Sequence, residues 1–65
     1  MRNPNRIDVF CDELKAMWHR VPDWRFGQLM MNFFGSIYEQ TKKDIWFIEE
    51  PEMLLYMQEY QKENV

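Results

Sequence analysis

The first third of the chain has the hydrophobic pattern of an amphipathic helix. Its apolar residues recur at helical spacing and share one face: Ile7, Phe10, Cys11, Leu14, Met17, Trp18 and Val21. Asn3 and Pro4 are typical of a helix start, with Asn as N-cap and Pro at the first helical position, although Asn5 is an alternative cap. Pro22 disfavours helical backbone in the residue before it. We therefore predict a helix over residues 4–20.

A second stripe of the same kind follows almost at once. Asp23 is a good N-cap, and beyond it one helical face is again apolar: Phe26, Leu29, Met30, Phe33, Phe34 and Ile37. The opposite face is polar: Arg25, Gln28, Asn32, Ser36 and Glu39. We predict a helix over residues 24–39, joined to the first by only one or two residues. So short a link requires an αα-hairpin or corner.

The second helix contains both glycines of the chain. Glycine in a helix costs about 1 kcal/mol relative to alanine, so its presence needs a reason. For Gly27 we expect close approach of the first helix, with Trp18 over the glycine; exposure of the backbone to a ligand is the alternative. Gly35 is either a second contact point or the residue that follows an early helix end.

An unbroken apolar run follows the loop at residues 41–44. It consists of Ile45, Trp46, Phe47 and Ile48. Its short length and flanking residues favour an extended segment, but no other stretch reads as a strand that could pair with it. Either the segment crosses the helices as irregular backbone, or it pairs with another chain. Because an exposed apolar edge invites association, we predict a homodimer in which residues 45–48 and the adjacent face of the third helix meet the same surfaces of a second copy.

Pro51, with a glutamate on each side, opens the third helix. We predict this helix over residues 51–62, with its buried face formed by Met53, Leu54, Met57 and Tyr60. The predicted fold is all-α: one compact three-helix domain, residues 1–65, with a short extended aromatic segment between the second and third helices.

Composition narrows the function. The chain has 65 residues, a formal net charge of −3 and one cysteine. The acidic balance does not favour binding to a nucleic-acid backbone, which usually needs a basic face. No apolar run approaches the roughly 20 residues of a membrane span, and the N-terminus lacks the apolar region of a signal peptide. The expected location is the cytoplasm.

Few residues suit catalysis. Cys11 and His19 are about 12 Å apart along one helix, so they cannot act as nucleophile and base. We expect Cys11 to be a small core side chain and His19 to be solvated. The glutamates around Pro51 complement the positive helix end better than they would ligate a cation. We therefore expect no enzyme activity, no metal and no cofactor.

The chain resembles a group of short helical proteins of bacterial and prophage genomes. The most specific part of the resemblance is an Asp-x-Arg-Phe/Leu-Gly-Gln motif, here Asp23, Arg25, Phe26, Gly27 and Gln28. The group has no assigned activity, so the resemblance implies a compact helical domain and a phage setting, but no catalytic residues. Where the group has Asp-Pro-Phe, this chain has Asp44, Ile45 and Trp46, and the loop before the aromatic pair departs from the pattern there.

One polar stripe could form directed hydrogen bonds. It consists of Arg25, Gln28 and Asn32, rimmed by Arg20 and Trp24. It is either a solvated helix face or a recognition surface, because Arg and Trp are frequent hot-spot residues. We predict a non-enzymatic protein-binding domain, in a phage setting an inhibitor of a host protein or defence complex. The alternative is a nucleic-acid-binding protein of helix-turn-helix type, in which the same stripe would read bases.

Overall fold

The chain folds into three α-helices and one short 3-10 turn in the computed structural model, which describes residues 2–63. The helices are α1 (Asn5–His19), α2 (Phe26–Thr41) and α3 (Glu50–Glu63), and the turn η1 (Ile45–Phe47) lies between α2 and α3. No β-strand occurs among the described residues. The predicted all-α, three-helix class is confirmed, and every predicted helix end lies within two residues of the observed one.

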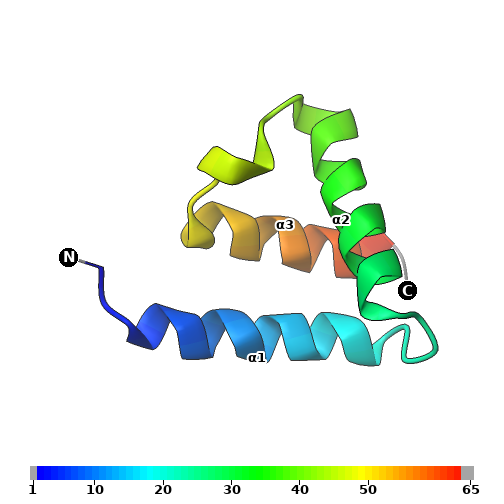
Figure 1. Cartoon of the computed structure of the whole chain (residues 1–65), viewed down its shortest axis with the longest axis horizontal. Helices are drawn as coiled ribbons and strands as arrows, with labels where there is room; N and C mark the ends of the chain where they lie inside the picture. Colours follow the sequence, from blue (N-terminus) through cyan, green and yellow to red (C-terminus); the bar gives the residue numbers. More distant parts are fainter. Residues whose placement is uncertain (1, 64–65) are drawn as a thin grey trace.

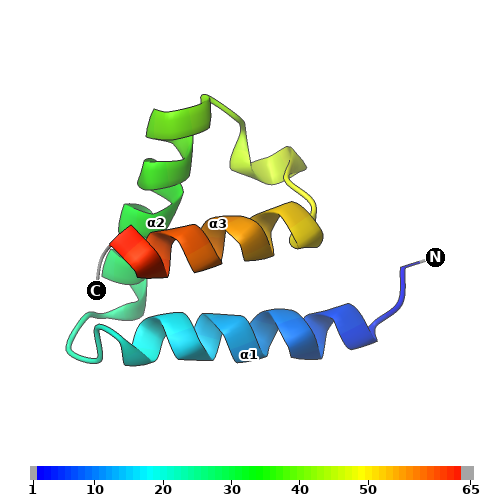
Figure 2. The same cartoon turned by 180° about the vertical axis from the view of Figure 1, so that it is seen from behind.

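The three helices are arranged as a parallel pair with one crossing helix. α1 and α3 lie side by side and run in the same direction, and α2 crosses them near their C-terminal ends (Figures 1 and 2). The α1–α3 contact is the most extensive between helices. η1 lies over the N-terminal end of α3, far from the link between α1 and α2 (Figure 1). α2 therefore covers only one end of the helix pair. Residues 1, 64 and 65, at the ends of the predicted domain, lie outside the described part.

The start of α1 follows the sequence prediction closely. The Asn3 Oδ1 atom accepts the backbone N–H of Asn5 at 2.9 Å, so Asn3 caps the first turn as expected. Pro4 precedes the first regular helical residue and has helical dihedral angles, which suit its fixed φ. The helix ends at His19, before Pro22.

The link between α1 and α2 is longer than predicted. Six residues, 20–25, separate the helices instead of one or two. The N–H of Trp24 donates to the carbonyl oxygen of Val21 at 3.0 Å, so Asp23 lies inside a turn and does not cap α2. The cap comes from inside the helix, because Gln28 Oε1 accepts the N–H of Arg25 at 2.8 Å. The predicted Asp23 cap is wrong.

The expected role of Gly27 is also wrong. A Cβ atom built on Gly27 would meet no atom within 4 Å, so no other helix packs against this glycine. The Trp18 ring lies instead against Phe26, with 5.6 Å between ring centroids, and its Nε1–H donates to the Trp24 carbonyl at 2.9 Å. Gly35 also faces open space, and α2 continues past it to Thr41, so it is neither a contact point nor a helix end.

The core is small and lies where α2 crosses the helix pair. Its buried members are Met17, Leu29, Phe33, Ile37, Met53, Met57 and Tyr60. Met17 is the only described residue of α1 among them. Cys11 is exposed, which contradicts the prediction that it belongs to the core. Ile7 and Val9 on the same helix are 53% and 58% exposed. The N-terminal half of α1 therefore keeps apolar surface that no described element covers.

Candidate protein-binding surface

The aromatic segment forms one 3-10 turn instead of an extended strand. The Asp44 Oδ1 atom accepts the N–H of Trp46 at 3.0 Å, and the Asp44 carbonyl accepts the N–H of Phe47 at 3.1 Å. The N–H of Ile48 donates to the Ile45 carbonyl at 3.2 Å. Because these backbone donors are satisfied within the segment, it presents no strand edge to another chain.

The side chains of this turn divide between the core and the solvent. Ile45 and Ile48 are half-buried and pack against the core cluster. Trp46 is 85% exposed and Phe47 is 76% exposed. An aromatic side chain buries roughly 150–250 Å² when it enters a contact. Left in water, these two side chains contribute almost nothing to the stability of a monomer. The two aromatic side chains are the strongest exposed apolar feature of the described chain.

A hollow of about 400 Å³ adjoins these aromatics, between η1 and the N-terminal ends of α1 and α3. Its walls are mostly apolar, with charges at the rim: Ile7, Phe10, Trp46, Ile48, Met53, Arg2, Arg6 and Glu50. We call the surface formed by Ile7, Phe10, Trp46, Phe47 and Ile48 the aromatic corner. It combines a projecting pair of rings with an adjacent hollow of the size that protein pockets commonly have.

Ion pairs hold the corner from the α1 side. Arg2 contacts Glu49 at 2.7 Å, and Arg6 pairs with Glu50 at the start of α3. The positive charges come from the beginning of the chain and the negative ones from the segment that follows η1. Each exposed pair adds little to folding stability. Together they join the two N-terminal helix ends that flank the hollow.

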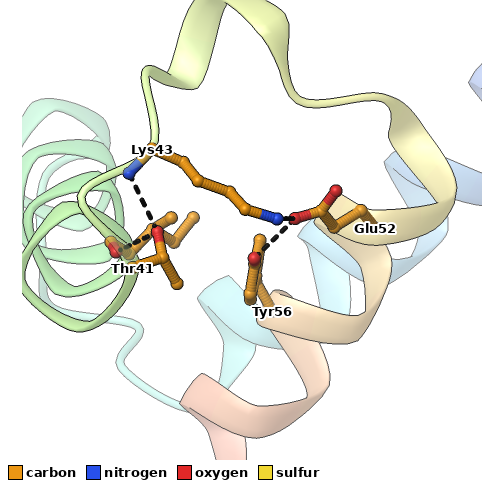
Figure 3. Close-up of polar contacts among 5 residues, drawn as sticks. Thr41, Lys43, Glu52 and Tyr56 are labelled. Atoms are coloured by element: carbon orange, nitrogen blue, oxygen red, sulfur yellow. Dashed lines mark hydrogen bonds and ion pairs between the residues drawn. The ribbon is translucent and has the colours of Figure 1, made fainter.

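A third ion pair holds the corner from the α2 side (Figure 3). Lys43, in the loop after α2, pairs with Glu52, and the Tyr56 hydroxyl donates to the same carboxylate at 2.5 Å. The Lys43 ammonium and then the Tyr56 hydroxyl lower the pKa of Glu52 below its ordinary value. The hydrogen bond to Glu52 raises the pKa of Lys43 in turn. This cluster ties the loop that leads into η1 to the first turns of α3.

The end of α2 directs the chain into that loop. Lys42 has φ of 60°, a left-handed conformation that is uncommon outside glycine, and its N–H donates to the Tyr38 carbonyl at 2.8 Å. The Thr41 hydroxyl donates to the Ile37 carbonyl at 2.8 Å and accepts the N–H of Lys43 at 3.1 Å (Figure 3). The chain reverses at this point, and Lys43 is thereby aimed toward α3.

The predicted recognition stripe lies at the opposite end of the molecule, near the link between α1 and α2 (Figure 1). Arg20 Nε donates to Gln61 Oε1 at 3.2 Å, and Gln28 Oε1 accepts the N–H of Arg25. Trp24 is half-buried and packs against the core cluster. Arg20, Arg25 and Gln28 are nevertheless exposed, so their side chains remain accessible to a partner.

The remaining member of the stripe, Asn32, is exposed. Asn32 and Trp24 do come together, since both line an open groove of about 510 Å³ between α2 and α3. Gly35 and Tyr60 also line this groove, and burial raises the pKa of the Tyr60 hydroxyl. Of the predicted stripe and its rim, Asn32 and Trp24 line this groove, which is separate from the aromatic corner, whereas Arg20, Arg25 and Gln28 do not line it.

Comparisons with family models, curated proteins and solved structures returned no match for this chain. The resemblance to prophage proteins therefore stays a prediction. Within residues 2–63, no helix has the length and apolar character needed to cross a bilayer.

Proposed function

We propose that this chain is a non-enzymatic protein-binding domain and that the aromatic corner is its binding surface. The observation that carries the proposal is the exposure of Trp46 and Phe47, at 85% and 76%, on a turn whose backbone is hydrogen-bonded. Trp and Tyr anchors in a rigid setting supply much of the binding energy of protein interfaces. A preformed turn also loses little conformational entropy on binding.

The ion pairs support the same proposal. Arg2, Arg6 and Lys43 approach the start of α3 from two different elements. They surround the apolar surface with charged side chains, and protein interfaces have the same arrangement of an apolar centre and a polar rim. The corner thus offers an anchor, a hollow and a rim in one place.

The phage setting adds a proposal about the partner. A free, exposed Cys11 suits a reducing cytoplasm, and the proposed partner there is a bacterial host protein, such as a component of a defence complex that the chain inhibits. The nucleic-acid alternative has no specific support, because the sequence of α2 contains no Lys or Arg. The acidic net charge of −3 points the same way.

The test is capture from bacterial cells that co-express a tagged and an untagged copy of the chain. The tagged copy is expected to retrieve a protein, either from the host or the untagged copy. A Trp46→Ala and Phe47→Ala double variant is expected to lose it. Met31→Ala is the matched control, because Met31 is also 76% exposed but lies on α2.

Two results would count against the proposal. The wild-type chain might retrieve nothing, in which case the corner is not a binding surface. Alternatively, an Arg25→Ala and Asn32→Ala variant could lose the captured protein while the corner variant retains it. That outcome would move the binding surface to the predicted recognition stripe.

A further inference from the structure

The molecule exposes more surface than a monomer of its mass usually does. Its accessible surface is 5175 Å², whereas a folded monomer of 8.2 kDa is expected to expose about 4,500 Å². The radius of gyration is 11.9 Å, against about 10.7 Å for a compact chain of this length. The excess of roughly 600 Å² approaches the ~800 Å² that each partner buries in a standard interface.

Part of the exposed apolar surface lies where α2 leaves the helix pair uncovered. Ile7 is 53% exposed, Trp46 85% and Phe47 76%, and all three belong to the aromatic corner. The core holds only seven buried residues among those described. A chain of this size commonly needs a disulfide, a metal or a second subunit to become more stable, and its single cysteine allows no internal disulfide.

We infer that the aromatic corner is the interface of a two-fold homodimer; this inference rests on the proposed function and identifies the partner as a second copy. The first reason is shape. In a two-fold interface the same surface serves both partners, so it must carry both a projection and a recess. The corner carries both: Trp46 and Phe47 are largely exposed, and Trp46 also lines the hollow together with Ile7, Phe10 and Met53.

The second reason is charge. The chain has a net charge of −3, so most pairings of two copies bring like charges together. The rim of the corner is balanced instead, with Arg2 beside Glu49 and Arg6 beside Glu50. Two copies that meet here encounter no net repulsion from these rim charges. An acidic or a basic partner would leave half of these charges unmatched.

The predicted dimer thus keeps its location but changes its physical basis. The segment 45–48 does not add a strand to another chain, because its backbone N–H groups are satisfied by Asp44 and Ile45. Side-chain packing of Trp46 and Phe47 replaces strand pairing as the source of association. The second copy thereby takes the place of a host protein as the occupant of the aromatic corner.

Sedimentation equilibrium of the full chain tests the inference, over a loading range from about 1 µM to about 1 mM, which suits an interface at the small end of the standard size. The mass is expected to rise from 8.2 kDa toward twice that value. Trp46→Lys is expected to weaken the dimer at least about 30-fold, the effect of losing a hot-spot residue. Met31→Lys, equally charged and at a position of α2 that is as exposed as Phe47, is expected to dimerise normally.

Far-UV circular dichroism of each variant supplies the folding check, and Phe47→Lys supplies a second corner variant. Both replaced side chains are largely in solvent, so the monomer fold should persist. A monomer mass at all concentrations overturns the inference; the proposed function then survives only if the corner variant still loses a host protein in the capture experiment. A dimer that both corner variants retain, or that Met31→Lys disrupts, overturns it as well by placing the interface elsewhere.

Discussion

Replacing Gly35 by alanine is expected to stabilise the fold. Gly35 lies in the interior of α2, which runs from Phe26 to Thr41, and its φ is not positive. A Cβ atom at this position would meet nothing within 4 Å. The new methyl group therefore causes no clash, while the unfolded chain loses backbone freedom that glycine allows.

The expected gain in folding stability is set by helix propensity. Alanine is favoured over glycine by about 1 kcal/mol in a helix interior, and for a domain of this size that corresponds to a rise in Tm of about 4–8 °C. Gly27→Ala should give a smaller rise, because Gly27 is the second residue of α2 and helix ends fray. The reverse change on another helix, Ala16→Gly at an exposed position of α1, should lower Tm by a similar amount.

Thermal unfolding followed by far-UV circular dichroism measures all three variants. Dimerisation makes Tm depend on concentration, so the series is best repeated in the Trp46→Lys background. A lower Tm for Gly35→Ala in that background would refute the reasoning, because something in the monomer would then occupy the space beside Gly35. A lower Tm only in the dimerising background would mean that the outer face of α2 contacts the second copy.

Three further predictions follow from single contacts. Trp18→Phe removes the indole N–H that donates to the Trp24 carbonyl and shrinks a partly buried ring, so urea unfolding should show a loss of between about 1 and 3 kcal/mol. The pKa of Glu52 is lowered by Lys43, so the contribution of Glu52 to folding stability is present above the ordinary glutamate pKa and is lost as pH falls through the lowered pKa. Glu52→Gln should therefore flatten the acid side of a plot of Tm against pH, and an unchanged acid side would contradict this. Burial raises the pKa of Tyr60, so the contribution of the neutral Tyr60 hydroxyl to folding stability is present below the ordinary tyrosine pKa and is lost as pH rises through the raised pKa. Tyr60→Phe should therefore make Tm less sensitive to alkaline pH, and equal sensitivity would refute this role of Tyr60.

The helices could be predicted because their signals are local. Pro22 and Pro51 limit the ends of two helices through their own backbone geometry, and the apolar stripe of α2 matches its buried face at Leu29, Phe33 and Ile37. A hydrophobic period specifies which face is buried, whatever covers it. For this reason the all-α class and the helix bounds could be read from the sequence alone.

The predictions that are wrong concern residues whose environment depends on which other part of the chain packs against them. Cys11 fits the apolar stripe of α1, but α2 crosses nearer the other end of that helix, so the thiol stays exposed. Asp23 is a good capping residue, but the turn closed by Trp24 and Val21 starts α2 later. Trp18, the expected neighbour of Gly27, packs instead on Phe26. The positions at which helices cross are decided by tertiary packing, and the periodicity of apolar residues does not encode them.

The aromatic corner combines a local sequence signal with a feature that the hydrophobic pattern does not indicate. Four consecutive apolar residues predicted a strand-like segment, yet Asp44 provides a side-chain oxygen one residue before the run and closes a 3-10 turn. An Asp before an apolar run of this length is thus a signal for a turn that buries Ile45 and Ile48 and leaves Trp46 and Phe47 outside. An extended strand would have alternated the faces, with one aromatic on each side. The turn instead leaves both rings in solvent, and this is the exposed apolar surface that the proposed dimer would cover.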